Sequence, residues 1–248
     1  MRRAILLGAA ICAILLLAVW ALVARGRAEP AGATENRPDL ALFSSLPLYW
    51  AESSDIFTAL RLGGEIHRAR TALEGAYALR PVDTLDDLTG STRNLLMAQP
   101  RPLSPRENVA LDGWVRRGGR VLLFADPALT QDSAFALGDR RRPQDTVLLS
   151  PILTRWGLTL EFVEDQPLGE RMASLGGVAL PVNLPGRLVA TPGGPCRIEA
   201  AGLLANCRVG QGRVTVIADA ALFERQYQAA ATELRRRALL ALAEEAFR

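Results

Sequence analysis

Short apolar runs alternate with helix-like segments along most of the chain, and glycine, proline or charged residues separate them. Residues 40–45, 77–83, 94–99 and 121–124 form such runs. Runs of this length between turn residues are typical of strands that are buried on both faces of a parallel sheet. Because helical segments connect them, the pattern predicts an open α/β sheet with helices packed on its faces.

The segment between the third and fourth runs carries the strongest helix signals. Ser104 can cap the helix, Pro105 suits its first turn, and Glu107 completes a capping box. The apolar side and the glycine stop are formed by Val109, Leu111, Trp114, Val115, Gly118 and Gly119. The pattern therefore predicts a helix that begins after Ser104 and ends before the two glycines.

Other segments have weaker patterns. The expected helices lie at residues 53–60, 65–75, 150–156 and 228–247, with a strand at 158–163. From residue 176 to 216, short apolar runs between glycine, proline and asparagine predict antiparallel hairpins. Residues 213–223 repeat the pattern of residues 120–129, so we expect both stretches to be sheet strands that end on an aspartate, at Asp126 and Asp219.

The beginning of the chain differs from the rest. Residues 4–24 are 21 uncharged residues, and about 20 apolar residues in a helix suffice to cross a bilayer. We expect an uncleaved signal anchor with a cytoplasmic N-terminus, and a cleaved signal peptide is the alternative. The chain then divides into a tip and anchor (1–28), a linker (29–38) and a periplasmic α/β domain (39–248), and the protein is a single-pass protein of the inner membrane.

The distribution of charge explains the basic composition. The formal net charge is +3, but four arginines lie in residues 1–28, and residues 29–248 carry 25 arginines and 26 acidic residues. The excess of arginine over acidic residues lies in the expected anchor, so no nucleic-acid partner is expected. The chain contains no lysine, which excludes a phosphate-loop lysine and lysine-based catalysis. The arginine run at 140–142 is interpreted as a solvated loop, with contact to an acidic partner as the alternative.

Two of the three cysteines lie in the expected exported part, and Cys12 lies in the expected membrane span. Cys196 and Cys207 are eleven residues apart in the hairpin region. In an oxidising compartment, two cysteines on adjacent strands of a hairpin form a disulfide. The sequence favours this pairing over two buried free thiols.

Polar residues at the expected strand ends are the candidates for a ligand-binding site. They are Ser44, Ser45, Gln99, Asp126 and Asp219. Ligands of open α/β sheets bind outside the carboxyl ends of the strands, and paired carboxylates there could hold a metal or act as acid and base. The simpler interpretation is that each aspartate caps the turn that follows it. One histidine and two cysteines that favour pairing do not supply a zinc site, and neither a metal nor a cofactor is expected.

A serine hydrolase would have to use the single histidine, His67, with Ser44 or Ser45 and an aspartate. His67 lies on an expected helix beside Arg68, and no G-x-S-x-G elbow precedes a helix. This alternative predicts that the three groups converge in one pocket within hydrogen-bond reach.

Part of the chain is similar to a known family. The strand "LLMAQP", the stretch "LSPRENVALDGWVRRGGRVLLFADP" and the late "VGQGRVTVIADAALF" carry the similarity. They resemble the class I glutamine amidotransferase-like domain of GldG-type proteins, which are membrane-anchored auxiliary components of ABC transporters, and a related domain of unknown function in bacterial membrane proteins. The resemblance covers roughly residues 38–225 and implies a flavodoxin-like three-layer fold. Amidotransferases of this fold use a cysteine nucleophile on a strand-to-helix elbow, but Pro100 follows "LLMAQ" here, so no catalytic residue carries over.

The sequence thus predicts a flavodoxin-like three-layer α/β domain, with antiparallel hairpin additions near its C-terminus, preceded by one transmembrane helix. The expected function is that of a non-catalytic, membrane-anchored periplasmic component of an ABC-type transport system. It would bind a partner protein, such as the ATPase or permease subunits, or a ligand. Small-ligand sensing in a crevice around Ser45, Gln99 and Asp126 is a further alternative, and it requires a concave pocket there.

Overall fold

In the computed structural model, Pro38–Arg248 form one compact unit that contains every described helix and strand. The structure describes residues 37–52, 66–86, 88, 91–225 and 228–248. The expected membrane span and the expected helix at 53–60 lie outside these residues. Within the described residues, no helix is both long enough and apolar enough to cross a membrane.

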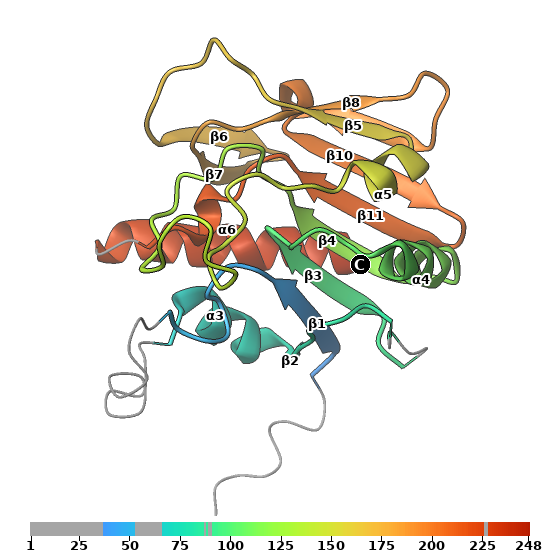
Figure 1. Ribbon diagram of the computed structural model, residues 1–248, viewed down its shortest axis with the longest axis horizontal. Coiled ribbons are helices and arrows are strands. Elements are labelled where there is room, and N and C mark those ends of the chain that lie inside the picture. Colours follow the sequence, from blue (N-terminus) through green and yellow to red (C-terminus); the bar gives the residue numbers. More distant parts are fainter. Residues whose placement is uncertain (1–36, 53–65, 87, 89–90, 226–227) are drawn as a thin grey trace, which may run out of the picture. The chain divides into compact units, whose positions relative to one another are not determined.

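A seven-stranded mixed sheet forms the centre of this compact unit (Figure 1). In spatial order its strands are β2 (Ala78–Pro81), β1 (Asp39–Ser44), β3 (Asn94–Ala98), β4 (Arg120–Phe124), β11 (Gly212–Ile217), β10 (Leu204–Val209) and β9 (Cys196–Glu199). The first five are parallel to one another, and β10 and β9 are antiparallel additions. The parallel strands have the 2-1-3-4-5 order of flavodoxin-like sheets. The predicted α/β sheet with antiparallel additions is therefore confirmed.

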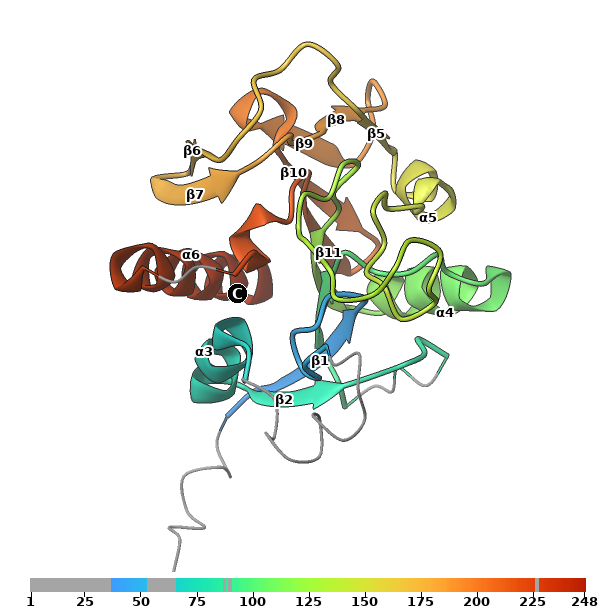
Figure 2. The same cartoon turned by 60° about the vertical axis from the view of Figure 1, so that its left-hand side comes forward.

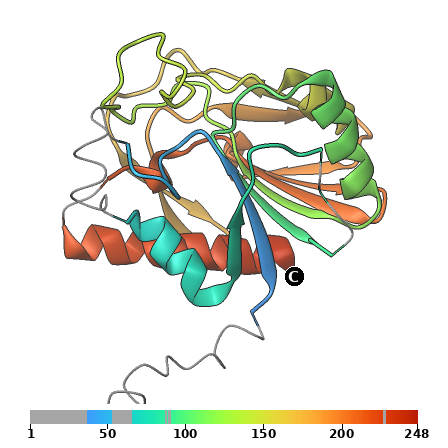
Figure 3. The same ribbon diagram turned by 60° about the horizontal axis from the view of Figure 1, so that its bottom comes forward.

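Helices cover both faces of the sheet. α3 (Arg68–Ala76) and α6 (Ala229–Phe247) lie side by side on one face, and α4 (Pro105–Arg116) and α5 (Ser150–Arg155) lie on the other (Figures 2 and 3). The helices predicted at 150–156 and 228–247 are confirmed to within a residue at each end.

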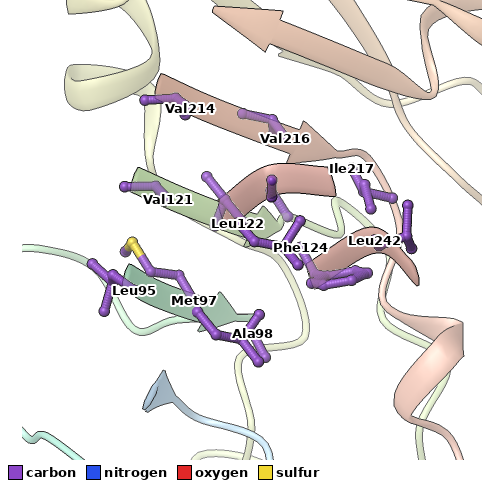
Figure 4. Close-up of a cluster of buried hydrophobic side chains, with 14 of the residues drawn as sticks. Leu95, Met97, Ala98, Val121, Leu122, Phe124, Val214, Val216, Ile217 and Leu242 are labelled. Atoms are coloured by element: carbon purple, nitrogen blue, oxygen red, sulfur yellow. The ribbon is translucent and has the colours of Figure 1, made fainter. Parts of the chain in front are cut away.

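The core lies where the central strands meet the helices. Figure 4 shows apolar side chains of β3, β4 and β11 in one cluster with Leu242 of α6. Leu95, Met97, Val121, Leu122, Phe124, Val214, Val216 and Ile217 are each 0% exposed. The ring of Phe124 also packs edge-on against Phe223, with ring centroids 4.8 Å apart. Strands that are apolar on both sides fit this position because helices cover both faces of the sheet.

The capping signals of α4 act as the sequence predicts. The Glu107 amide donates to Ser104 Oγ at 3.2 Å, and Glu107 Oε2 accepts from the Ser104 amide at 2.9 Å. Gly118, which follows the helix, has a φ of +108°, a conformation that strongly favours glycine. The expected beginning and end of this helix are confirmed.

The prediction that Val109 lies on the apolar side of α4 is wrong. Leu111, Trp114 and Val115 are buried, but Val109 is 72% exposed. At about 100° per residue, Val109 lies roughly 120–160° around the helix from the other three. The apolar side of α4 is therefore narrower than the four residues suggest.

Two small antiparallel strand pairs lie outside the central sheet. β5 (Leu158–Glu161) pairs with β8 (Arg187–Ala190), and β6 (Arg171–Leu175) pairs with β7 (Val178–Val182), both in antiparallel register. The strand predicted at 158–163 is therefore present, but its partner is a strand much later in the chain. Pairing between distant segments is not visible in local periodicity.

A disulfide joins Cys196 of β9 to Cys207 of β10. The two residues are register partners in the antiparallel pair, and Cys207 is 1% exposed. The bond ties β9, the edge strand of the sheet, to its neighbour.

Reduction of this disulfide should lower the free energy of unfolding. A cross-link that closes a loop of about this length contributes roughly 2–4 kcal/mol. Urea titrations with and without reductant should show a lower midpoint for the reduced protein. The C196S/C207A double variant is the control, since its midpoint should not respond to reductant. An unchanged wild-type midpoint would contradict the assignment.

Candidate functional site

The candidate residues are brought together along the carboxyl-terminal edge of the sheet. Ser44 ends β1 and Ser45 follows it, Gln99 follows β3, and Asp126 and Asp219 lie two residues beyond β4 and β11. Because β1, β3, β4 and β11 are neighbours in the sheet (Figure 1), all five residues lie at one edge. Their contacts decide which of them can meet a ligand.

The two serine hydroxyls bond to backbone groups. Ser44 Oγ lies 2.9 Å from the Ala98 carbonyl and 3.2 Å from the Leu46 carbonyl, and it accepts from the Leu46 amide at 3.0 Å. Ser45 Oγ donates to the Gln99 carbonyl and accepts from the Gln144 amide. These bonds close the turn after β1 and hold it against the end of β3.

Gln99 is fully buried and continues the pairing of β3 with β4 beyond the ends of the strands. Its Nε2 donates to the carbonyls of Asp126 at 2.9 Å and Gln144 at 2.8 Å, and its Oε1 accepts from the Asp126 amide at 2.8 Å. A side-chain amide has the donor and acceptor of a peptide group. Gln99 also has a φ of 42°, which is uncommon for a residue other than glycine.

Asp126 and Asp219 are each 1% exposed and accept bonds from backbone amides. Asp126 Oδ1 accepts from Ala128 at 2.8 Å, and Asp126 Oδ2 accepts from Ala220 at 3.1 Å. Asp219 Oδ1 accepts from Ala221 at 2.7 Å, and Asp219 Oδ2 accepts from Asn183 at 2.9 Å. The bonds to Ala128 and Ala221 are those that the turn-capping interpretation predicts.

Burial changes the protonation of this pair. Burial raises the pKa of Asp126 to about 6, although the hydrogen bonds from its two amide donors lower the pKa. Burial, together with the charge of Asp126, raises the pKa of Asp219 to about 8. Two buried carboxylates near each other do not both ionise easily. The pKa of Asp219 is therefore raised further than that of Asp126, and Asp219 keeps its proton to a higher pH.

A crevice of about 290 Å³ opens at the same edge, above β1 and β2. Its lining consists of Ser44 and Ser45 with the segment from Leu46 to Glu52, Asp83, Phe135 and Arg141, among others. Gln99, Asp126 and Asp219 are not part of this lining; they lie buried beside it. Of the predicted site residues, the structure thus places the two serines at a concave surface.

Aromatic and charged side chains shape the crevice. Trp50 is 72% exposed and packs edge-on against Tyr49, with ring centroids 4.9 Å apart. The Arg141 guanidinium lies 4.3 Å from the centroid of the Phe135 ring. Glu52 accepts bonds from Ser133 Oγ at 2.9 Å and from the Ala134 amide at 2.7 Å, and these fix the loop that carries Phe135. Of these residues, the sequence singled out only Arg141, as part of the arginine run at 140–142, because the others lie in irregular segments without a periodic pattern.

The single histidine caps a helix. His67 Nδ1 accepts from the Ala69 amide at 3.2 Å. Its Nε2 lies 3.0 Å from the Phe223 carbonyl, so Nε2 carries the proton of the neutral ring and donates it. His67 lines a cavity beside α6, whereas the serines line the crevice above β1. The hydrolase alternative requires His67 and a serine in one pocket, and the described residues do not have this arrangement.

Among the described residues, no group of three or more His, Cys, Asp or Glu side chains is placed to hold a metal ion. The carboxylates of Asp126 and Asp219 already accept two backbone bonds each.

The sequence profile of a family described as "ABC-type uncharacterized transport system" matches residues 37–164. No curated protein matches the chain. The matched range includes β1 to β5 and every residue that lines the crevice.

Solved structures resemble the chain at low sequence identity. An exo-β-1,4-mannosidase from Opitutaceae bacterium strain TAV5 is 15% identical, with a TM-score of 0.47 over 84% of this chain and 35% of its own. A cytoplasmic protein from Salmonella typhimurium is 10% identical, with a TM-score of 0.43 over 83% of this chain and 99% of its own. A ThuA-like protein from Parabacteroides merdae ATCC 43184 is 11% identical, with a TM-score of 0.39 over 85% of this chain and 90% of its own. The chain spans about a third of the length of the mannosidase.

The pKa values of Asp126 and Asp219 predict that the protein is more stable in mild acid than in mild base. Between the ordinary aspartate pKa of 3.8 and the folded value of about 8, the folded state holds a proton that the unfolded state has lost. The free energy of unfolding should therefore fall as pH rises from 5 to 8, by up to about 1.4 kcal/mol per pH unit for one proton. Urea titrations across this range measure the slope.

The D219N variant should lose most of this slope, because its amide does not titrate. Asp139 provides a matched control, since hydrogen bonds from Arg141 hold its pKa at about 2, outside the range tested. D139N should keep the wild-type slope. Parallel pH profiles of the wild type and D219N would show that Asp219 does not bind the proton.

Proposed function

Because the chain belongs to the family of auxiliary proteins of ABC-type uncharacterized transport systems, we propose that it is a non-catalytic, membrane-anchored periplasmic component that binds a subunit of such a transporter. The match over residues 37–164 is the observation that carries the proposal. It supports an accessory role, and the finer points rest on the following features of the chain.

The uncharged segment at residues 4–24 supports the membrane anchor, since its 21 residues are long enough to span a bilayer. The disulfide between Cys196 and Cys207 supports a periplasmic location of the folded domain, because disulfides persist in oxidising compartments and are rare in the cytosol.

The bonding of the polar residues favours a binding role over catalysis. A general base needs a free acceptor within reach of the group that it deprotonates. Both ring nitrogens of His67 bond to backbone groups, and so do the hydroxyls of Ser44 and Ser45. These side chains hold turns in place, and the adjacent crevice is left to make contact with a partner.

The crevice has the composition of a protein-binding surface. Aromatic residues and arginine are enriched at interfaces, and buried aromatic anchors carry much of the binding energy there. Trp50, Phe135 and Arg141 supply such side chains at one concave surface. Trp50 is 72% exposed in the isolated chain, so a partner could bury most of its ring. We assign the transporter subunit to this surface.

Photo-crosslinking in native membranes tests the proposal. A benzophenone amino acid placed at position 50 of the full-length chain should crosslink to an ABC permease or ATPase subunit, identified by mass spectrometry after purification through a C-terminal tag. The matched control is the same residue at position 168, where Leu168 is 86% exposed but does not line the crevice. It should give little or no such crosslink.

A second variant measures the contribution of the crevice. The F135A substitution should reduce recovery of the transporter subunits at least several-fold, as loss of an interface anchor does. Equal crosslinking from positions 50 and 168 would contradict the crevice as the binding surface. If well-expressed intact protein yields no transporter subunit from either position, partner binding itself is contradicted, and ligand sensing in the crevice becomes the better hypothesis.

A further inference from the structure

A second cavity lies where α3 and α6 begin, away from the residues of the crevice. Its volume is about 70 Å³, and it is lined by the first turn of α3, the chain just after β11 and the first half of α6. Figures 2 and 3 show α3 and α6 next to each other on one face of the sheet. Roughly 10–15 Å³ suffices for one water molecule, so the cavity is large enough for a tetrahedral or planar oxyanion.

Arginine predominates among the charged residues that line the cavity, although Arg235 and Arg236 are paired with acidic residues. Four arginines line the cavity, Arg68, Arg225, Arg235 and Arg236, against a single carboxylate, Glu224. Arg236 pairs with Glu233 outside the lining, at 2.7 Å. Among the described residues, Arg68 and Arg225 have neither an ion pair nor a hydrogen bond to their side chains. Both side chains are exposed, so their guanidinium groups can reach an anion in the cavity.

Arg235 adds a buried donor that lacks an acceptor. The residue is 7% exposed, and it pairs with Glu170 through Nη2. Its Nε has no hydrogen-bond partner within the described structure. A buried donor without a partner is costly, and most such groups in proteins are satisfied by the chain, by water or by a ligand. This unsatisfied donor belongs to a guanidinium that lines the cavity, where an anion could accept a hydrogen bond from it.

The N-terminus of α3 also favours the binding of an anion in the cavity. The helix N-terminus carries a partial positive charge and favours anions. α3 is the helix that follows β1 in a 2-1-3-4-5 sheet, so its N-terminus lies at the carboxyl-terminal edge, where open α/β sheets bind ligands. His67, Arg68 and Ala69 from this first turn all line the cavity.

An apolar groove adjoins the cavity and shares Arg68, Thr232 and Arg236 with it. The groove runs between α3 and α6 over small residues of α3, including Ala72 and Gly75. A Cβ atom built on Gly75 would meet nothing within 4 Å, so the space above this residue is open. A ligand whose anionic group enters the cavity can extend along this groove.

We propose that the cavity binds a phosphate or carboxylate group carried on a short aliphatic chain, with the oxyanion held among Arg68, Arg225 and Arg235 and the aliphatic chain in the groove between α3 and α6. Guanidinium groups suit such anions because they donate two parallel hydrogen bonds to them. The small side chains of the groove suit an unbranched chain. The site is independent of the crevice that we assign to the transporter subunit.

Three soluble probes test this site by isothermal titration calorimetry of the full-length chain in lipid nanodiscs, with empty discs as the blank. They are hexyl phosphate, inorganic phosphate and hexyltrimethylammonium. Hexyl phosphate should bind, inorganic phosphate should bind at least several-fold more weakly, and the cation should not bind. Equal affinity for the two phosphates would overturn the aliphatic part of the proposal and leave a site for a free oxyanion. Equal binding of the cation would overturn the anion site, since only the alkyl chain would then be recognised.

Variants locate the binding. R68A/R225A should raise the dissociation constant of both phosphates about tenfold or more, because charge-assisted hydrogen bonds are lost. Both arginines are exposed, so the fold should persist, and an unchanged unfolding temperature verifies this. R117A is the matched control, because Arg117 is an exposed arginine at the end of α4, on the opposite face of the sheet. Unchanged affinity in R68A/R225A would overturn the proposal.

A single substitution tests the groove separately from the cavity. G75L places a side chain in the open space above α3, and it replaces glycine inside a helix by a better helix former, so the protein should remain folded. G75L should weaken the binding of hexyl phosphate several-fold and leave the binding of inorganic phosphate unchanged. An equal effect on both phosphates, or none on either, would contradict the placement of the aliphatic chain.

Discussion

The carboxyl ends of the parallel strands carry peptide groups that the sheet no longer pairs, and the rest of the structure depends on how the chain supplies their partners. Gln99 acts as a substitute peptide group for Asp126, with one bond in each direction. Asp126 then accepts from Ala220, which joins the turn after β4 to the turn after β11. Asp219 accepts from Asn183, which follows β7, and so holds the β6–β7 pair to the same edge. Three buried side chains thus anchor the long excursion between β4 and β11. Their burial is also the reason that both carboxyls have raised pKa values.

The same network bears on the relation to amidotransferase-like domains. That resemblance implies a nucleophile on an elbow between a strand and a helix, and in this chain Gln99 lies between β3 and α4. Gln99 has a φ of 42° and is 0% exposed. Its left-handed backbone turns the chain sharply, but its side chain lies inside the protein and bonds to Asp126 and Gln144. A sharp turn after a strand therefore does not need a reactive residue to explain it. Here the strain is compensated by three hydrogen bonds that close the sheet edge.

Local patterns in the sequence predicted most of the fold, and the failures have a common physical cause. The capping box at Ser104 and the apolar run at 121–124 are contiguous signals, and the structure has both elements. The pairing of β5 with β8 depends on contact between segments far apart in the chain, which no local pattern contains. The candidate site likewise combines features that local patterns predict with features that depend on contacts between distant segments. The sequence predicts that the strand-end polar residues gather at one edge, and they do, but it does not show that the loop carrying Gln144 bonds to Gln99 and Ser45 there. Trp50 and Phe135, which shape the crevice, lie in irregular segments and could not be singled out from the sequence alone.

The crevice and the basic cavity are separate sites, but the first turn of α3 contributes to both. Arg68 lines the cavity. Two residues later, Arg70 donates to the Tyr49 carbonyl at 2.9 Å, and its guanidinium lies 3.9 Å from the centroid of the Tyr49 ring. Tyr49 in turn packs against Trp50 in the crevice. An anion bound at Arg68 would therefore contact the same helical turn that fixes Tyr49. Coupling between two sites requires an element that both ligands contact differently in two states. The first turn of α3 meets the structural part of that requirement, because Arg68 lines the basic cavity and Arg70 contacts Tyr49 in the aromatic wall of the crevice.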